Sequence, residues 1–271
     1  MSSGATVLTG DIRDEQYIRN ENLIIISIQR CSTIGSYAFC YCYNLKQVYI
    51  SEGLISISNG AFSNTQMLEY IELPNSLQSI GKNCFDYCKN ISSITLPNSL
   101  QTIGEYAFRE CIKLSSVTFQ SAVTIGESCF SKCLSLTNII LPEYEITFTK
   151  LVFEYCTNIK EVYFSDSIQN LGVSTFSYCT SLETVRFPST LRVITEGIFI
   201  RCNSLKSIQI PPSVTRIDQF SFYYCTNLTS DFVFPQGLQF IGTNSFSNCI
   251  SITNITIPGT VTTIESGAFE N

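Results

Sequence analysis

Residues 92–111, SSITLPNSLQTIGEYAFREC, contain one structural repeat that decides the fold. Apolar and polar residues alternate up to Leu96, which predicts a short strand with one buried face. Pro97 ends this strand because proline has no N–H to donate to a ladder. A second short extended piece and a glycine bend follow, and the AFREC segment is predicted to be a helical turn with Phe108 and Cys111 facing inward.

The phenylalanine of this repeat recurs along the chain at intervals of 23 residues, with one interval of 22 and one of 24. Eleven of the nineteen phenylalanines occupy this slot: Phe39, Phe62, Phe85, Phe108, Phe130, Phe153, Phe176, Phe199, Phe222, Phe246 and Phe269. An aliphatic residue precedes almost every one of these phenylalanines by five positions. Seven of the eight prolines also recur at one position of the repeat. A fixed period of this length indicates a repeat architecture, so we expect one array of about eleven coils.

Stacking is what makes such coils stable. One coil cannot bury its own apolar side, but stacked coils can, with strands ~4.8 Å apart in a parallel ladder. The pattern predicts a single repeat domain over residues 23–271, preceded by an N-terminal cap or tail at residues 1–22. The last coil stops at Asn271, one residue short of its cysteine slot. Either the chain is a fragment of a longer array, or the open end of this coil permits end-to-end self-association.

Nine of the thirteen cysteines lie three residues after the repeated phenylalanine, and Thr65 replaces the cysteine in one coil. We interpret the nine as a ladder of buried packing residues, since free cysteine is among the most buried residue types. Disulfides or a metal site are the alternatives, and zinc is disfavoured because the chain has no histidine and no CxxC pair. Cys40 is predicted to lie on a more exposed flank and to be the most reactive thiol. The ladder consists of Cys42, Cys88, Cys111, Cys133, Cys156, Cys179, Cys202, Cys225 and Cys249.

Composition excludes several classes of function. The formal charge is −6 and no basic stripe is present, which argues against nucleic acid or an anionic membrane as partner. The longest aliphatic run, LIIISI at residues 23–28, is far shorter than the ~20 residues that span a bilayer, and no secretory signal is visible. Without histidine, and without a phosphate-binding or nucleophile-elbow motif, we expect no catalysis and no cofactor.

The repeat resembles the BspA-like (Treponema pallidum) class of leucine-rich repeats, whose unit reads roughly LxxIxLPxxLxxIGxxAFxxC. Residues 92–111 match this unit almost slot for slot, and the resemblance covers about residues 23–271. It implies a curved solenoid with a parallel sheet on its concave side. Members of the family are commonly bacterial or protist surface proteins linked to adhesion and host-protein binding.

The outward slots of the predicted strands are the expected binding surface, because solenoids bind partners along this face. Most of these slots hold Ser, Thr or Asn. Tyrosine and arginine, which are enriched at interface hot spots, interrupt them in two groups. Residues that favour exposed sheet faces are the alternative interpretation. The candidate binding residues are Tyr49, Tyr70 and Glu72 near the N-terminal end, and Glu161, Tyr163 and Arg186 in the middle.

A further stripe of tyrosines directly precedes the cysteine slot. We interpret it as amphipathic cover of the core on the convex or lateral side, with a carbohydrate or protein platform as the alternative. The stripe consists of Tyr41, Tyr87, Tyr155, Tyr178 and Tyr224.

The sequence therefore favours a non-enzymatic binding protein that recognises a protein or glycan through its concave face, in adhesion at the cell surface or after secretion. The alternative is an intracellular, cytoplasmic scaffold or a purely structural solenoid, which the missing signal and the many thiols favour.

Overall fold

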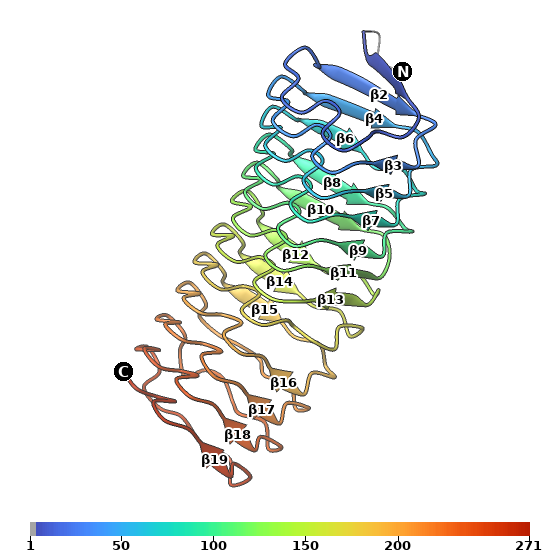
Figure 1. Ribbon diagram of the computed structural model, residues 1–271. Coiled ribbons are helices and arrows are strands. Elements are labelled where there is room, and N and C mark those ends of the chain that lie inside the picture. The colour runs from blue at the N-terminus through green and yellow to red at the C-terminus, as the bar shows by residue number, and fades with distance from the viewer. Residues whose placement is uncertain (1–3) are drawn as a thin grey trace. The chain divides into compact units, whose positions relative to one another are not determined.

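The computed structural model describes residues 4–271, which fall into two compact units, Met1–Leu136 and Thr137–Asn271. Both units are parallel β-solenoids built from the same coil, and no helix occurs in residues 4–271 (Figure 1). The predicted leucine-rich repeat solenoid is thus confirmed. The single domain predicted over residues 23–271 stays a prediction, and residues 1–3 of the predicted N-terminal cap lie outside the described residues.

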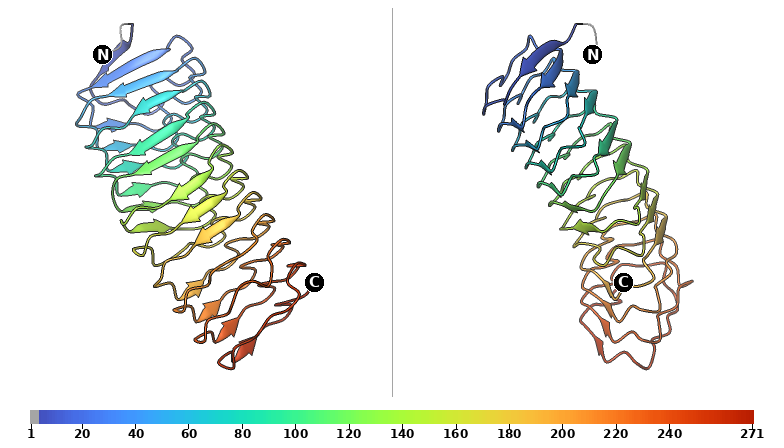
Figure 2. Two further views of the ribbon diagram at one scale, coloured as in Figure 1. Left: turned by 180° about the vertical axis from the view of Figure 1, so that it is seen from behind. Right: turned by 90° about the vertical axis from the view of Figure 1, so that its right-hand side faces the viewer.

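Unit 1 carries strands on two sides of each coil, a long-strand sheet and a short-strand sheet (Figure 2). In the long-strand sheet, β1 (Thr6–Thr9), β2 (Ile25–Gln29), β4 (Gln47–Ile50) and β6 (Tyr70–Glu72) pair in that order, and β8 (Ser93–Leu96) pairs with β10 (Ser116–Phe119). The short-strand sheet of this unit runs β3 (Thr33–Ile34), β5 (Ser56–Ile57), β7 (Ser79–Ile80), β9 (Thr102–Ile103) and β11 (Val123–Ile125). Every pairing is parallel, at a sequence separation close to one repeat.

Unit 2 repeats this arrangement with more interruptions. Its long-strand sheet consists of β12 (Asn138–Ile140), β14 (Glu161–Tyr163) and β15 (Thr184–Arg186). Its short-strand side contains β13 (Ile146–Phe148) and the sheet β16 (Val193–Ile194), β17 (Arg216–Ile217), β18 (Phe240–Ile241) and β19 (Thr263–Ile264).

The three coils after β15 have no assigned long strand within the described residues, although the alternating pattern predicts one in each. One of these coils, at 229–235, carries one extra residue. The hydroxyl of Ser230 takes over as acceptor for the N–H groups of Thr253 and Asn254, at 2.9 and 3.1 Å.

The repeated phenylalanines form the core of both units. In unit 1 the rings stack nearly parallel with centroids 5.0–5.4 Å apart. In unit 2 the same slot stacks at 5.0–5.6 Å except for Phe176 and Phe199, whose centroids are 6.1 Å apart. The inward orientation predicted for this slot is therefore confirmed.

The AFxxC segment is not the helical turn that the sequence predicts but a run of overlapping turns. Residues two before and two after the core phenylalanine have left-handed φ, as at Asn83 (54°) and Tyr87 (60°) around Phe85. This alternation sends successive N–H groups in two directions. Phe85 N donates to Ala107 O of the next coil at 2.7 Å, whereas Cys88 N donates to Phe85 O within the coil at 3.1 Å. A third inter-coil ladder results, and a helix could not supply it because its N–H groups all point one way along the axis.

Residues 6–20 form a further coil that the sequence pattern did not reveal. Strand β1 pairs with β2, Ile12 bridges to Ile34, and Tyr17 stacks on Phe39 with centroids 5.2 Å apart. Tyr17 therefore stands in the phenylalanine slot of this first coil. Its action as a cap stays a prediction.

The glycine after the aliphatic slot serves a close approach between coils in five coils, at Gly35, Gly81, Gly104, Gly126 and Gly242, whereas Gly172 has the left-handed φ of a tight bend. Gly81 has no left-handed φ, but an added Cβ would lie 2.6 Å from Ser58 C and Asn59 N of the preceding coil. Real Cβ atoms do not approach backbone this closely, so a larger residue requires the coils to move apart.

Candidate binding face

The strand face of each unit, the outward side of its long-strand sheet, holds the candidate binding residues. In unit 1, the parallel register places Tyr49 beside Glu72 and Gln47 beside Tyr70. The two tyrosine rings lie 5.5 Å apart at 45°, and Tyr70 OH donates to Glu72 Oε2 at 3.3 Å. The structure thus brings Tyr49, Tyr70 and Glu72 together as predicted.

This tyrosine group borders a groove of about 440 Å³ on the strand face. Tyr49 and Glu72 line it together with Arg30 and Glu52. Partial burial, followed by the nearby Glu72 carboxylate, raises the pKa of Tyr70. Tyr70 is therefore a neutral hydrogen-bonding phenol at physiological pH, 45% exposed and available to a partner.

The group in unit 2 has the same chemistry in a different order. The register aligns Ile140, Tyr163 and Arg186 in one row, with Glu161 in the row beside it. Tyr163 OH donates to Glu161 Oε2 at 3.3 Å. Tyr163 and Arg186 also line a groove of about 310 Å³ together with Asp166. The structure therefore brings Glu161, Tyr163 and Arg186 together as well.

Ile140 belongs to this second group although residue chemistry alone did not select it. It is 68% exposed and lies in register with Tyr163, so the row presents an aliphatic, an aromatic and a cationic side chain in succession. The signal was present in the repeat alignment, since Ile140 is one of the few apolar residues in an otherwise polar slot.

Two carboxylates at the margin of the strand face clamp neighbouring coils together. Glu52 accepts the N–H groups of Asn75 and Ser76, both at 2.9 Å, and Asp166 accepts that of Ser189 at 2.6 Å. Both acids lie ten residues before the core phenylalanine of their coil. These backbone hydrogen bonds lower the pKa of both carboxyl groups, because they stabilise the charged form.

The lowered pKa values predict that stability falls in acid. A carboxyl whose pKa is lower in the folded than in the unfolded protein stabilises the fold above its ordinary pKa, and this contribution disappears as pH falls through the folded value. We expect the free energy of unfolding, measured by urea titration, to drop between about pH 5 and pH 3. Glu52→Gln should flatten this dependence, whereas Glu69→Gln, an exposed glutamate in the same unit, should leave it unchanged. An identical slope in the two variants would contradict this role of Glu52.

The cysteine ladder is buried, as the sequence predicts, and its thiols make a defined contact. Cys88 Sγ donates to Phe62 O at 3.2 Å and Cys111 Sγ to Phe85 O at 3.3 Å, in each case the core residue one coil earlier. The same bond recurs at Cys202, Cys225 and Cys249. Burial raises the pKa of these thiols, to about 12 at Cys88, so they carry little thiolate.

The prediction that Cys40 is exposed and reactive is wrong. Cys40 is only 3% exposed, and burial raises the pKa of its thiol. Its slot, one residue after the core phenylalanine, also faces inward at Ser63 and Asp86 because of the alternating turns.

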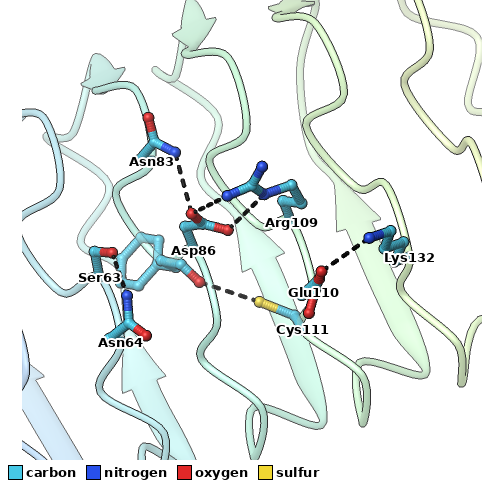
Figure 3. A network of polar contacts seen from close by, with 9 residues as sticks. Ser63, Asn64, Asn83, Asp86, Arg109, Glu110, Cys111 and Lys132 are labelled. Carbon is cyan, nitrogen blue, oxygen red and sulfur yellow. Dashed lines mark hydrogen bonds and ion pairs between the residues drawn. The ribbon is translucent and has the colours of Figure 1, made fainter.

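A partly buried ion pair lies in this same slot in unit 1 (Figure 3). Arg109 Nε and Nη2 donate to the two oxygens of Asp86 at 2.9 and 2.7 Å, and Asn83 donates to Asp86 at 3.1 Å. The guanidinium also lies over the rings of Tyr106 and Tyr87, at 4.8 and 5.4 Å. Glu110 and Lys132, two residues after the core slot, form a second inter-coil pair at 3.0 Å. These charges join neighbouring coils of unit 1.

Two neighbouring rings of the tyrosine stripe before the cysteine slot stack on each other. Tyr155 and Tyr178 lie 4.4 Å apart at 17°, and Arg201 lies 5.9 Å from the Tyr178 ring and 4.4 Å from that of Tyr224. Cover of the core and a carbohydrate or protein platform both stay predictions for this stripe.

The described residues 4–271 contain no group of three or more His, Cys, Asp or Glu side chains that could hold a metal ion. Within the same residues, no helix is long and apolar enough to cross a membrane.

A family model described as BspA type Leucine rich repeat region matches six copies in the chain, over residues 32–160 and 146–271. A search of curated protein sequences found no match. Among solved structures, a leucine-rich repeat protein from Bacteroides ovatus ATCC 8483 is 28% identical, with a TM-score of 0.66 over 92% of this chain and 78% of that one. A leucine-rich repeat protein from Eubacterium ventriosum ATCC 27560 is 21% identical, with a TM-score of 0.60 over 97% and 90%. A leucine rich cell surface protein from Faecalibacterium prausnitzii A2-165 is 24% identical, with a TM-score of 0.48 over 91% and 82%.

Proposed function

The chain belongs to the BspA-type leucine-rich repeat family, and from this membership we propose that it is a non-enzymatic binding protein whose strand face holds a partner protein. The observation that carries the proposal is the chemistry of that face. A sheet surface of Ser and Thr is interrupted by two groups in which a tyrosine hydroxyl contacts a glutamate, one of them beside Arg186 and the exposed Ile140. Such amphipathic side chains are typical of interface hot spots.

We assign the finer role to adhesion at the cell surface, with a protein rather than a glycan as ligand. Support for a protein comes from the mixed character of the row Ile140, Tyr163 and Arg186, which combines apolar, aromatic and cationic contacts. Support for a surface role comes from the family resemblance.

The double substitution Tyr163→Ala, Arg186→Ala tests the proposed function. Truncating two hot-spot residues should weaken partner binding by about 30-fold, equivalent to about 2 kcal/mol. Binding is measured by surface plasmon resonance against partner protein captured from candidate host material on the immobilised chain. Thr184→Ala, an exposed position on the same strand, is the matched control and should bind like the original chain. Both variants should have melting temperatures within a few degrees of that of the original chain. An unchanged affinity in the double variant would mean that the strand face is not the binding surface.

A cytoplasmic scaffold is the second candidate, and the buried thiols favour it, since reduced cysteines persist in reducing compartments. We expect a thiol reagent to label none of the thirteen cysteines in the native protein and all thirteen after denaturation, because all are buried. Protein isolated from its own cell under alkylating conditions separates the candidates. Thirteen reduced thiols support the scaffold, and extensive pairing supports the secreted adhesin.

A further inference from the structure

The long strands of unit 1 contain a single charged residue, Glu72. The strands β1, β2, β4, β6, β8 and β10 are otherwise built from apolar side chains, hydroxyls, amides and the two tyrosines Tyr49 and Tyr70. Glu72 is exposed, and no lysine or arginine of residues 4–271 forms an ion pair with it. The strand face of unit 1 therefore presents an anion without a cation of its own.

Two aromatic rings lie beside this anion. The register places Tyr49 next to Glu72, and the Tyr49 and Tyr70 ring centroids are 5.5 Å apart. Tyr70 OH donates to Glu72 Oε2 at 3.3 Å, and Tyr49 OH donates to Gln47 Oε1 at 3.1 Å. Glu72 Oε1 accepts no hydrogen bond from the described part of the chain. Ring faces and a carboxylate oxygen both attract a cation.

The groove of about 440 Å³ beside this group has an excess of negative charge. The charged residues that line it are Arg30, Glu52 and Glu72. Arg30 follows the end of β2 and forms an ion pair with neither carboxylate in the described residues. Glu52 already accepts the N–H groups of Asn75 and Ser76. Glu72 is therefore the carboxylate that is left to bind a charged group of a partner.

Unit 1 contains a filled version of the same arrangement away from the strand face. The Arg109 guanidinium lies 4.8 Å from the Tyr106 ring and 5.4 Å from the Tyr87 ring. It also donates to both oxygens of Asp86, at 2.9 and 2.7 Å (Figure 3). Two tyrosines and one carboxylate hold a guanidinium there. On the strand face, the two tyrosines and the carboxylate are present and the guanidinium is the missing part.

We propose that Tyr49, Tyr70 and Glu72 form a subsite for an arginine side chain of the partner protein. The inference rests on the proposed function and names the chemistry of its partner. The guanidinium packs against the tyrosine rings and donates to Glu72. Arginine fits better than lysine, because its planar group stacks on aromatic rings and presents parallel donors to a carboxylate. In unit 2 the corresponding group contains its own cation, since Arg186 lies in register with Tyr163, so the arginine subsite is specific to unit 1.

NMR titration of the full chain labelled with 15N-tyrosine tests the subsite. The probe is the peptide acetyl-Gly-Ser-Arg-Ser-Gly-amide, which carries one arginine and no other charge. It should shift the amide signals of Tyr49 and Tyr70 in a saturable way and leave those of Tyr43 and Tyr155 in place. The same peptide with citrulline, the neutral isostere of arginine, should bind about fivefold more weakly, because it lacks the charge that attracts Glu72.

Protein variants provide the matched controls. Glu72→Gln should weaken the arginine peptide about fivefold, whereas Glu21→Gln, at an exposed glutamate outside the strands, should leave its Kd unchanged. Tyr70→Leu, followed at the Tyr49 signal, should weaken it about threefold by removing one ring.

This experiment uses no partner protein, so its failure is distinct from failure of the proposed function. Equal binding of the arginine and citrulline peptides would overturn the arginine subsite. An unchanged Kd in Glu72→Gln, or the absence of saturable shifts at Tyr49 and Tyr70 up to the solubility limit of the peptide, would also overturn it. In each case, loss of partner binding in the Tyr163→Ala, Arg186→Ala variant would still support the strand face as the binding surface.

Discussion

Replacing Phe85 by Ala is expected to lower the free energy of unfolding by about 3–5 kcal/mol, the range for deleting a buried aromatic side chain. Phe85 is fully buried and stacks on Phe62 and Phe108, at 5.4 and 5.0 Å. The substitution removes contacts to both neighbouring coils at once, and the ladder hydrogen bonds around it prevent the cavity from collapsing. Urea unfolding followed by circular dichroism measures the effect.

The matched control is Tyr43→Ala in the same unit. Tyr43 is 43% exposed, so its replacement should lower the free energy of unfolding by less than about 1 kcal/mol. Because solenoid coils contact mainly their neighbours, Phe85→Ala should also broaden the transition as the coils on its two sides begin to unfold separately. A loss no larger than that of the Tyr43 variant would mean that the phenylalanine column does not hold the coils together.

Arg109→Met is expected to cost about 3 kcal/mol, because it leaves a buried carboxylate without its cation. The Asp86 side chain is only 6% exposed, whereas Arg109 is 31% exposed. After the substitution, Asn83 is the one remaining side-chain donor to Asp86 shown in Figure 3. The free energy of unfolding at neutral pH, measured by urea titration, gives the loss.

Replacing the other partner of the pair, Asp86→Asn, should lower the free energy of unfolding by less, about 1 kcal/mol. The amide keeps an acceptor oxygen for the guanidinium, and Arg109 can reach water. A double-mutant cycle should show a coupling of more than about 1 kcal/mol between the two residues. Equal losses in the two single variants, or additive losses in the double variant, would mean that the pair is not a buried contact between coils.

The fold follows from the sequence because every coil repeats the same few requirements. A phenylalanine, a small thiol and alternating apolar residues recur at one spacing, and a fixed period of this length is the signature of a repeat architecture. The cysteine slot was assigned correctly as buried, although the inter-coil hydrogen bond of each thiol, such as Cys111 to Phe85 O, could not be read from residue type.

The coil of residues 6–20 and the overlapping turns of the AFxxC segment were not predicted from the sequence, for physical reasons. Tyr17 is aromatic and fills the core slot, but its coil has no phenylalanine in that slot and no cysteine three residues later, so it does not match the repeat. Left-handed φ at Asn83 and Tyr87 carries no sequence signature shared by all coils, because the hydrogen-bond ladder and not the residue type holds it.

The ion pair between Asp86 and Arg109 could have been found by comparing neighbouring repeats slot by slot. Asp86 and Arg109 occupy one slot in adjacent coils, and opposite charges in stacked slots predict contact. Both groups of candidate binding residues were likewise brought together because strand register follows repeat register. The interruption of the short strands before β16 could not be predicted, since it depends on the left-handed φ of Gly172, 70°.

The central claim, that partners bind on the strand face, is tested most directly by hydroxyl-radical footprinting of the tyrosines in the complex. The account predicts that bound partner protein lowers oxidation of Tyr70 and Tyr163, while Tyr37 and Tyr155, which are 45% and 37% exposed away from that face, stay as reactive as in the unbound chain. Protection of Tyr37 and Tyr155 with unchanged oxidation of Tyr70 and Tyr163 would contradict it.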